Sequence, residues 1–303
     1  MKAARFEYQR ASSLTDALSK LHTGDVSTST KVIAGSQSLG PMLNMRLTRP
    51  DNLVDVSQLP DLLNVRQETD GIRIGAGVTH AQIEDGRHDL LRGHPLQSVA
   101  RDIAYRAVRN RGTIGGSLAH ADPAADWVVV LSAFDAIVHI ASHQSQRNLP
   151  ISQFLVGAYT TALKADELIT GITIPNPPQD IHWGYVKFCR KPGEFAHASA
   201  AVRFEASTAT ACIILGALDG PPTTLPQLAA ALARGESQAM SRANLLQSVS
   251  AVVDANDAAR CQWHAVAIER ALQQAGICGI PLSKGSKGSK GSTGNSGNGG
   301  GNA

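Results

Sequence analysis

Two short segments combine glycine with hydroxyl side chains, and they are the parts of this sequence best suited to bind an anion. The first glycine loop, 34–40, reads Ala-Gly-Ser-Gln-Ser-Leu-Gly, and the second glycine loop, 113–117, reads Thr-Ile-Gly-Gly-Ser. Because glycine has no Cβ, the backbone N–H groups of such loops can approach a phosphate closely. Two such loops in one chain favour a phosphate-binding site over a pair of ordinary tight turns.

The familiar nucleotide-binding fingerprints are absent from these loops. The first has the G-x-x-x-x-G frame of a P-loop, but Pro41 stands where the phosphate-binding lysine belongs. Gly75-Ala76-Gly77 begins like a Rossmann fingerprint, yet His80 replaces its third glycine. The first loop does not form the G-x-S-x-G pattern of a hydrolase nucleophile elbow. The sequence therefore disfavours hydrolysis of ATP or GTP and indicates a different nucleotide.

Cysteine and histidine spacing predicts no metal site. The four cysteines carry no C-x-x-C pair, which suits neither a zinc ribbon nor an iron–sulfur cluster; they are Cys189, Cys212, Cys261 and Cys278. Free thiols are typical of a reducing compartment. The N-terminal residues lack a signal-peptide pattern and no apolar run reaches membrane-spanning length, so we expect a cytoplasmic protein without a membrane span.

The charge balance argues against a nucleic-acid partner. The chain has 303 residues and a formal net charge of +3, but three of its lysines lie in the Gly/Ser/Lys/Asn-rich end at 282–303. The remaining 25 basic residues equal the 25 acidic ones, so the body has no basic excess to place on one face. A hydrophobic content of 43% predicts a compact body, and the end, with nothing to bury, is expected to be a disordered tail.

Periodicity predicts the elements that position the loops. Leu18 and Leu21 recur at helical spacing, and a Thr79/Gln82 capping box begins another helix. Asp122-Pro123 is typical of a helix start, while the glycines of 111–117 should exclude helix there. Before residue 176 we expect helices at 95–110 and 123–133, and strands at 31–34, 52–56, 71–75, 136–140 and 168–174.

The prolines at 175, 177 and 178 indicate a domain boundary. Beyond them, alternating apolar residues between turns predict an antiparallel meander, with strands at 183–190, 197–204 and 210–218. Helices are expected at 226–234, 243–253 and 260–275.

Both glycine loops lie in longer stretches that resemble the FAD-binding medium subunit of molybdenum hydroxylases. The stretches are AGSQSLGPMLNMRLTRP at 34–50 and VRNRGTIGGSLAHADPAAD at 108–126. This is the family of the carbon monoxide dehydrogenase medium subunit and the xanthine dehydrogenase FAD domain, and the similarity extends to about residue 275. It implies an α+β architecture: a two-subdomain, PCMH-type FAD-binding fold of the vanillyl-alcohol-oxidase kind at 1–176, with subdomains at about 1–56 and 57–176. A C-terminal antiparallel sheet plus helices would follow at 177–281.

The resemblance also implies which residues contact FAD. In the family, the first loop wraps the pyrophosphate, the second contacts the dinucleotide, an acidic residue of the next helix contacts the flavin nucleotide, and two later positions lie near the isoalloxazine. The corresponding residues are Val32, Ile33, Ala34, Gly35, Ser36, Gln37 and Ser38, then Thr113, Ile114, Gly115, Gly116 and Ser117, then Asp126, and lastly Ile169 and Lys187.

Two residues depart from the family pattern, and two have simpler interpretations. Ser36 replaces a glycine and would be strained at positive φ, and Ser117 replaces an asparagine. Asp126 could favour its helix N-terminus without any ligand. Lys187 alternates with Tyr185 along an expected strand, so a solvated strand face is the alternative for it.

The function implied is electron transfer in a heterotrimeric molybdenum hydroxylase or dehydrogenase. This chain would hold FAD and no catalytic residue of its own. A large partner subunit would carry the molybdenum cofactor and a small one the 2Fe–2S clusters, with a dimer of heterotrimers as a further assembly, and an external acceptor would take the electrons. Two alternatives stay open: a stand-alone FAD-dependent oxidoreductase of the same fold, and a flavin-free scaffold.

Overall fold

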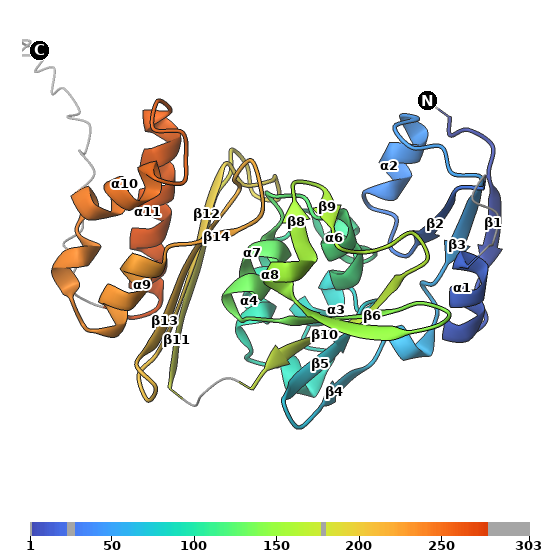
Figure 1. Ribbon diagram of the computed structural model, residues 1–303, viewed down its shortest axis with the longest axis horizontal. Coiled ribbons are helices and arrows are strands. Elements are labelled where there is room, and N and C mark those ends of the chain that lie inside the picture. Colours follow the sequence, from blue (N-terminus) through green and yellow to red (C-terminus); the bar gives the residue numbers. More distant parts are fainter. Residues whose placement is uncertain (1, 23–27, 177–179, 278–303) are drawn as a thin grey trace, which may run out of the picture.

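Among the described residues, three sheets of three to five strands lie side by side along the long axis of the molecule, with a two-stranded sheet beside the middle one (Figure 1). They belong to a computed structural model that describes residues 2–22, 28–176 and 180–277. Strands and helices are mixed throughout, so the predicted α+β class is confirmed. The tail predicted at 282–303 lies outside the described residues. None of the helices among the described residues is long and apolar enough to cross a membrane.

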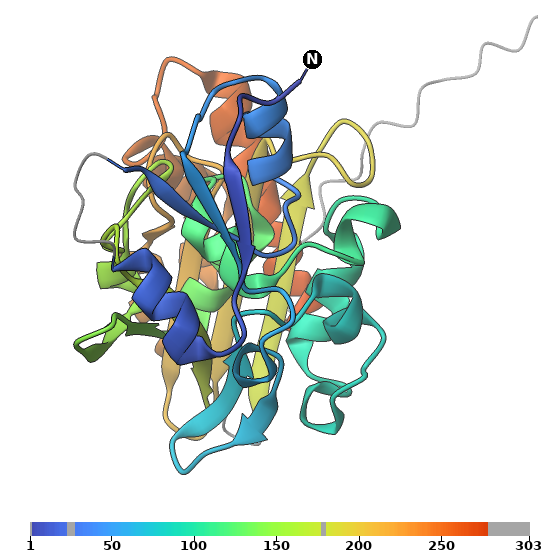
Figure 2. The same cartoon turned by 90° about the vertical axis from the view of Figure 1, so that its right-hand side faces the viewer.

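The N-terminal sheet is parallel, with strand order β1-β3-β2, and it faces the viewer in Figure 2. Ser13 caps the first helix by accepting a hydrogen bond from the Asp16 amide, and Leu18 and Leu21 bury its apolar side. The elements of this region are β1 (Glu7–Arg10), α1 (Leu14–Leu21), β2 (Thr30–Ile33), α2 (Leu39–Asn44) and β3 (Asn52–Asp55). Strand β2 thus leads directly into the first glycine loop, which α2 follows.

The middle sheet is antiparallel, with strand order β4-β5-β10-β6-β7. Its strands are β4 (Val65–Gln67), β5 (Gly71–Gly75), β6 (Ile137–Ala141), β7 (Gln146–Pro150) and β10 (Leu168–Pro175), with the small pair β8 (Leu155–Gly157) and β9 (Thr160–Thr161) beside it. Its helices are η1 (Pro60–Leu62), α3 (His80–Glu84), η2 (Asp89–Leu91), α4 (Pro95–Asp102), α5 (Arg106–Arg109), α6 (Ile114–His120), α7 (Asp126–Ala133) and α8 (Ile151–Phe154). The capping box predicted at Thr79 is present.

Two helix predictions in this region are wrong, and the buried helix expected at 123–133 is confirmed with a later start. The helix expected at 95–110 is two helices, α4 and α5, because Ala104 between them has a φ of 44°. Two of the glycines expected to exclude helix, Gly115 and Gly116, lie in α6, which begins at Ile114. Helix α7 begins at Asp126 rather than at Pro123, since Asp122 accepts the Ala124 amide in a turn instead of capping a helix.

The C-terminal sheet is an antiparallel meander, with strand order β11-β12-β13-β14. The three predicted strands and three predicted helices are confirmed, with shifted ends. The elements are β11 (Ile181–Phe188), β12 (Ala198–Glu205), β13 (Thr210–Gly216), β14 (Thr223–Thr224), α9 (Pro226–Ala233), η3 (Ser237–Met240), α10 (Arg242–Ser250) and α11 (Ala258–Gln274). Helices α9 to α11 cover one face of this sheet and α7 packs on the other (Figure 1).

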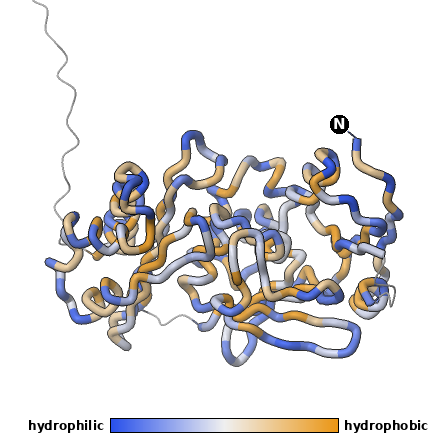
Figure 3. The backbone as a smooth tube through the Cα atoms, turned by 45° about the horizontal axis from the view of Figure 1, so that its top comes forward, coloured by the Kyte–Doolittle hydropathy of each residue, from blue (hydrophilic) through white to orange (hydrophobic). Residues whose placement is uncertain are grey.

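Two large hydrophobic cores meet at the C-terminal sheet. One lies between the middle sheet and α7, and the other lies between the C-terminal sheet and α9 to α11. Hydrophobic stretches follow the inner strands and helices in Figure 3, while many of the outer turns are hydrophilic. The N-terminal sheet has a smaller core of its own.

Candidate functional site

A cavity of about 1140 Å³ is lined by residues of the N-terminal sheet region and of the middle helices. Pockets for drug-sized ligands usually measure about 300–1,000 Å³, so this one has room for a larger ligand. Both glycine loops border it. The cavity is therefore the place where the two predicted anion-binding loops face a common space.

The first glycine loop offers free backbone donors to this cavity. Within the described ranges, the backbone amides of 35–38 donate to no protein acceptor. Ser36 has a φ of 62°, in the left-handed region that a non-glycine residue adopts at some cost, and Gln37 Nε2 steadies the turn by donating to the Gly35 carbonyl oxygen at 2.9 Å. Successive unengaged amides in such a turn form a concave site for an anion.

The second glycine loop is held differently, because its amides are already used. The amides of Ile114 and Gly115 donate to the carbonyl oxygens of Val78 and Ala76, at 3.0 and 2.9 Å. The Gly116 amide donates to Thr113 Oγ1 at 3.0 Å, which makes Thr113 the N-cap of α6. This loop therefore borders the cavity without a row of free amides.

Protein backbone, rather than open space, explains two of the glycines. A Cβ on Gly35 would lie 1.9 Å from the carbonyl oxygen of Arg111, and one on Gly115 would lie 2.8 Å from the carbonyl oxygen of Ala76. Gly35 is thus where the first loop packs against the residues just before the second. The glycines of the motif are therefore needed for the packing of one loop on the other, in addition to any role in admitting a ligand.

Asp126 and Lys187 form a buried ion pair at the cavity wall. Lys187 Nζ lies 2.8 Å from Asp126 Oδ1, their side chains are only 10% and 7% exposed, and the Tyr185 hydroxyl donates to Asp126 at 2.9 Å. Burial raises the pKa of the Asp126 carboxyl, and the Lys187 charge opposes that shift. The alternative of a solvated face for Lys187 is therefore wrong, since its strand turns this side chain inward.

The structure brings most of the predicted site residues together. The cavity is lined by Val32, Ala34, Gly35, Ser36, Gln37, Ser38, Thr113, Gly115, Gly116, Ser117, Asp126 and Ile169. Ile114 is fully buried in the middle core, Ile33 is not among the lining residues, and Lys187 reaches the wall through Asp126.

Sequence reasoning missed several residues at the cavity. Tyr105 and Phe195 line it while remaining 59% and 62% exposed, which places them where it opens to solvent. His80 and Trp127 line it from the inside, and Trp127 Nε1 donates to His80 Nδ1 at 3.0 Å. The only signal for His80 in the sequence is its place in the incomplete Rossmann pattern. Trp127 belongs to the middle hydrophobic core as well as to the cavity wall.

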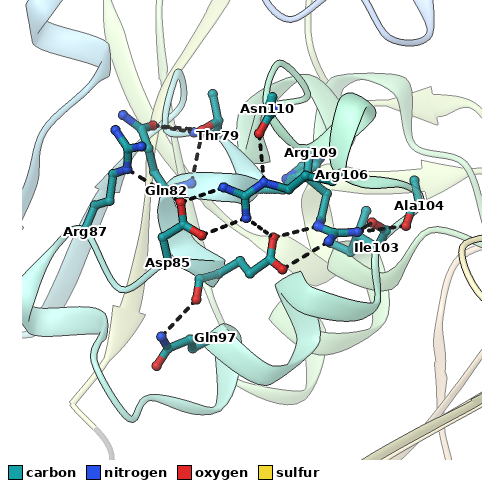
Figure 4. Close-up of polar contacts among 12 residues, drawn as sticks. Thr79, Gln82, Asp85, Arg87, Gln97, Ile103, Ala104, Arg106, Arg109 and Asn110 are labelled. Carbon is teal, nitrogen blue, oxygen red and sulfur yellow. Dashed lines mark hydrogen bonds and ion pairs between the residues drawn. The ribbon is translucent and has the colours of Figure 1, made fainter.

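An ion-pair network holds the segment that carries Tyr105. Arg109 donates to Glu84 at 2.7 and 3.0 Å and to the carbonyl oxygens of Ile103 and Ala104 at 3.0 and 2.9 Å. Arg106 bridges Asp85 and Glu84 beside it (Figure 4). The bond from Arg109 lowers the pKa of the Glu84 carboxyl. The network therefore fixes the left-handed turn at Ala104 against α3.

Comparison with known proteins gives a matching family model and several relatives. Residues 4–177 match the family model described as the FAD binding domain in molybdopterin dehydrogenase. The nicotine 6-hydroxylase medium subunit of Paenarthrobacter nicotinovorans is 38% identical over 202 residues, 67% of this chain and 70% of that protein. The carbon monoxide dehydrogenase medium chain of Hydrogenophaga pseudoflava is 32% identical over 252 residues, 83% of this chain and 85% of that protein. In the structure of reconstituted CO dehydrogenase from Oligotropha carboxidovorans, a 28% identical chain superposes with a TM-score of 0.80, covering 91% of this chain and 99% of that one.

Proposed function

The chain belongs to the family of FAD-binding domains in molybdopterin dehydrogenases, and we propose that its cavity holds FAD with the pyrophosphate on the first glycine loop. It is an FAD-binding medium subunit of the molybdenum hydroxylase kind, and so a subunit of an oxidoreductase. In this proposal residues 1–176 form the FAD-binding domain and 177–281 the C-terminal one. Its cysteine usage favours a cytoplasmic location.

The free amides of 35–38 are the observation that carries the proposal. They border a cavity large enough for a dinucleotide, and neutral N–H donors are suited to the oxygens of a pyrophosphate. Ser36 and Ser38 add hydroxyl groups to the same wall. The residues present therefore fit the pyrophosphate of FAD, and the first glycine loop would be its cradle.

The remaining predicted residues would hold the rest of the cofactor. The second glycine loop would contact the dinucleotide through the atoms that border the cavity, and Asp126, oriented by Lys187 and Tyr185, would accept hydrogen bonds from it. Ile169, which is 3% exposed and lines the cavity, would present an apolar surface near the flavin ring. Bound FAD would supply the capacity to take up and release electrons.

We infer that the chain works between partner subunits. Its relatives are named as medium subunits or medium chains of nicotine 6-hydroxylase and carbon monoxide dehydrogenase. By this analogy, a small subunit with 2Fe–2S clusters would deliver electrons, a large subunit would hold the molybdenum cofactor, and an external acceptor would remove the electrons. A dimer of such heterotrimers is the assembly we propose.

Purification from the source cell, without separating partners, tests this function. We expect FAD, iron and molybdenum in a fixed ratio, and one FAD per chain when the isolated full chain is titrated with it. FAD without either metal would favour a stand-alone oxidoreductase, and a full chain that takes up no FAD would contradict the proposal.

A further inference from the structure

His80 is a buried histidine at the inner end of the cavity. It is 5% exposed, it lines the cavity, and its backbone amide donates to the Gly112 carbonyl oxygen at 2.9 Å. Thr79 caps the helix that His80 begins, so two contacts fix the start of α3: this cap and the hydrogen bond to Gly112. The imidazole is therefore held in one place beside the second glycine loop.

Trp127 determines which ring nitrogen of His80 carries the hydrogen. An indole N–H can only donate, so the 3.0 Å contact from Trp127 Nε1 requires Nδ1 of His80 to accept. Burial, with the charge of Arg109, lowers the pKa of His80 to about 4, which keeps the ring neutral at pH 7. A neutral ring that accepts at Nδ1 carries its hydrogen on Nε2.

Nε2 of His80 is left as a donor at the cavity. It makes no hydrogen bond to any group of the described chain, yet it is not among the polar atoms sealed in the core without a partner. A Cβ on Gly112 would lie 2.9 Å from this nitrogen, and one on Gly35 would lie 2.9 Å from Gly112 Cα. The free N–H of His80 thus lies next to the place where Gly35 of the first glycine loop packs on Gly112, the residue just before the second loop.

We propose that His80 donates a hydrogen bond from Nε2 to a phosphate oxygen of bound FAD, with Trp127 as the residue that positions this donor. The inference rests on the proposed function and extends it to a residue outside both glycine loops. His80 would add a side-chain donor to the cradle formed by the amides of 35–38. A neutral donor contributes here without adding a charge that must be desolvated.

Titration of the full chain with FAD, in the wild type and two matched variants, tests the proposal. His80→Phe keeps a ring but removes the donor, and we expect FAD binding to weaken about 10-fold to 100-fold. His94→Phe is the control, because His94 is a half-buried histidine whose pKa is also lowered to about 4 by burial but which lies outside the cavity lining. It should bind FAD within about twofold of the wild type.

Two spectroscopic measurements separate a ligand contact from a structural role. In the full chain without FAD, ¹⁵N spectra should show His80 protonated on Nε2 alone, and Trp127→Phe should admit the other tautomer. In the FAD-bound chain, one ³¹P resonance of the cofactor should differ between the wild type and His80→Gln, whose amide supplies a substitute donor should His80→Phe fail to fold.

Each contrary outcome has a distinct meaning. A wild-type chain that binds no FAD overturns both the proposed function and the role of His80. Equal FAD affinity in the wild type and His80→Phe overturns only the role of His80. A proton found on Nδ1, or unchanged ³¹P resonances despite weaker binding, would also overturn it.

Discussion

The amides of the first glycine loop, at 35–38, donate to no acceptor among the described residues, whereas those of the second, at 114–117, all donate within the protein. The two loops are nonetheless alike in composition, and both line the same cavity. Carbonyl oxygens of Val78 and Ala76 occupy the N-terminus of α6, where a ligand anion would otherwise be expected. A glycine-rich motif therefore shows that some group comes close to the backbone. Only the hydrogen bonds of its amides show whether that group belongs to the protein or is left for a ligand.

The largest effect is expected where the two loops touch. Gly35→Ala should lower the free energy of unfolding by about 3 kcal/mol and abolish FAD binding, because its Cβ would overlap the Arg111 carbonyl oxygen. Urea unfolding and FAD titration measure the two effects. A variant as stable as the wild type would show that the loops are not in contact.

A smaller loss of stability is expected on removing the carboxylate of Glu84, which pairs with two arginines in the segment before the second glycine loop. Glu84→Gln should cost about 2 kcal/mol at pH 7, because Arg109 and Arg106 both donate to this carboxylate. The pKa of Glu84 is lowered in the folded state, so its stabilisation is present above the usual value of 4.5 and is lost as the pH falls through the folded value. Urea unfolding across pH should therefore show the wild type and the variant converging in acid; a difference that persists there would contradict the assignment.

Thr113→Val separates folding from binding in the second loop. It removes the acceptor for the Gly116 amide and should lower stability by about 1 kcal/mol. Because the amides of this loop serve the fold, the variant should lose only the cavity contact of Thr113 itself and weaken FAD binding by about two- to tenfold, rather than abolish it. A large loss of affinity without loss of stability would mean that the two loops do not differ as described.

The smallest effect is expected from relieving the backbone at Ser36. Ser36→Gly suits a φ of 62° and should raise stability by about 0.5–1 kcal/mol, with FAD still bound. Thermal unfolding with and without FAD measures both. An unchanged or lower midpoint would show that the serine hydroxyl contributes more than its backbone conformation costs.

The C-terminal sheet was predictable because its sequence is locally consistent. Apolar and polar residues alternate along the strands there. The helix at 226–233 begins at Pro226, and Gly276 follows the end of the helix at 258–274. Helix α6 was not predictable from the sequence, because glycine disfavours helix by about 1 kcal/mol per residue. It forms because Ile114 and Leu118 are fully buried and its first amides find acceptors on other segments. Such contacts cannot be read from the loop itself.

The residues of the candidate site also fall into two groups, those that the sequence identifies and those that only the folded structure brings to the cavity. The resemblance supplied the residues of the two loops and Asp126, which line the cavity as a group. It did not supply His80, Trp127 or Tyr105, whose places depend on α3, α7 and the turn at Ala104 meeting in space. Asp126 lies on helix α7 and its partner Lys187 on strand β11 of the C-terminal sheet, so no local pattern joins the two residues.

Helix α7 has consequences for how the molecule comes apart. Seven of its eight residues are buried, from Asp126 and Trp127 at the cavity wall to Ala133, and its far side packs on β12 and β13. Phe134, directly after it, meets Trp183 of the C-terminal sheet with ring centroids 4.6 Å apart. The cavity and the meander therefore share one helix and should melt as a single cooperative unit. Chimeras that exchange the C-terminal part between relatives would need to exchange α7 with it.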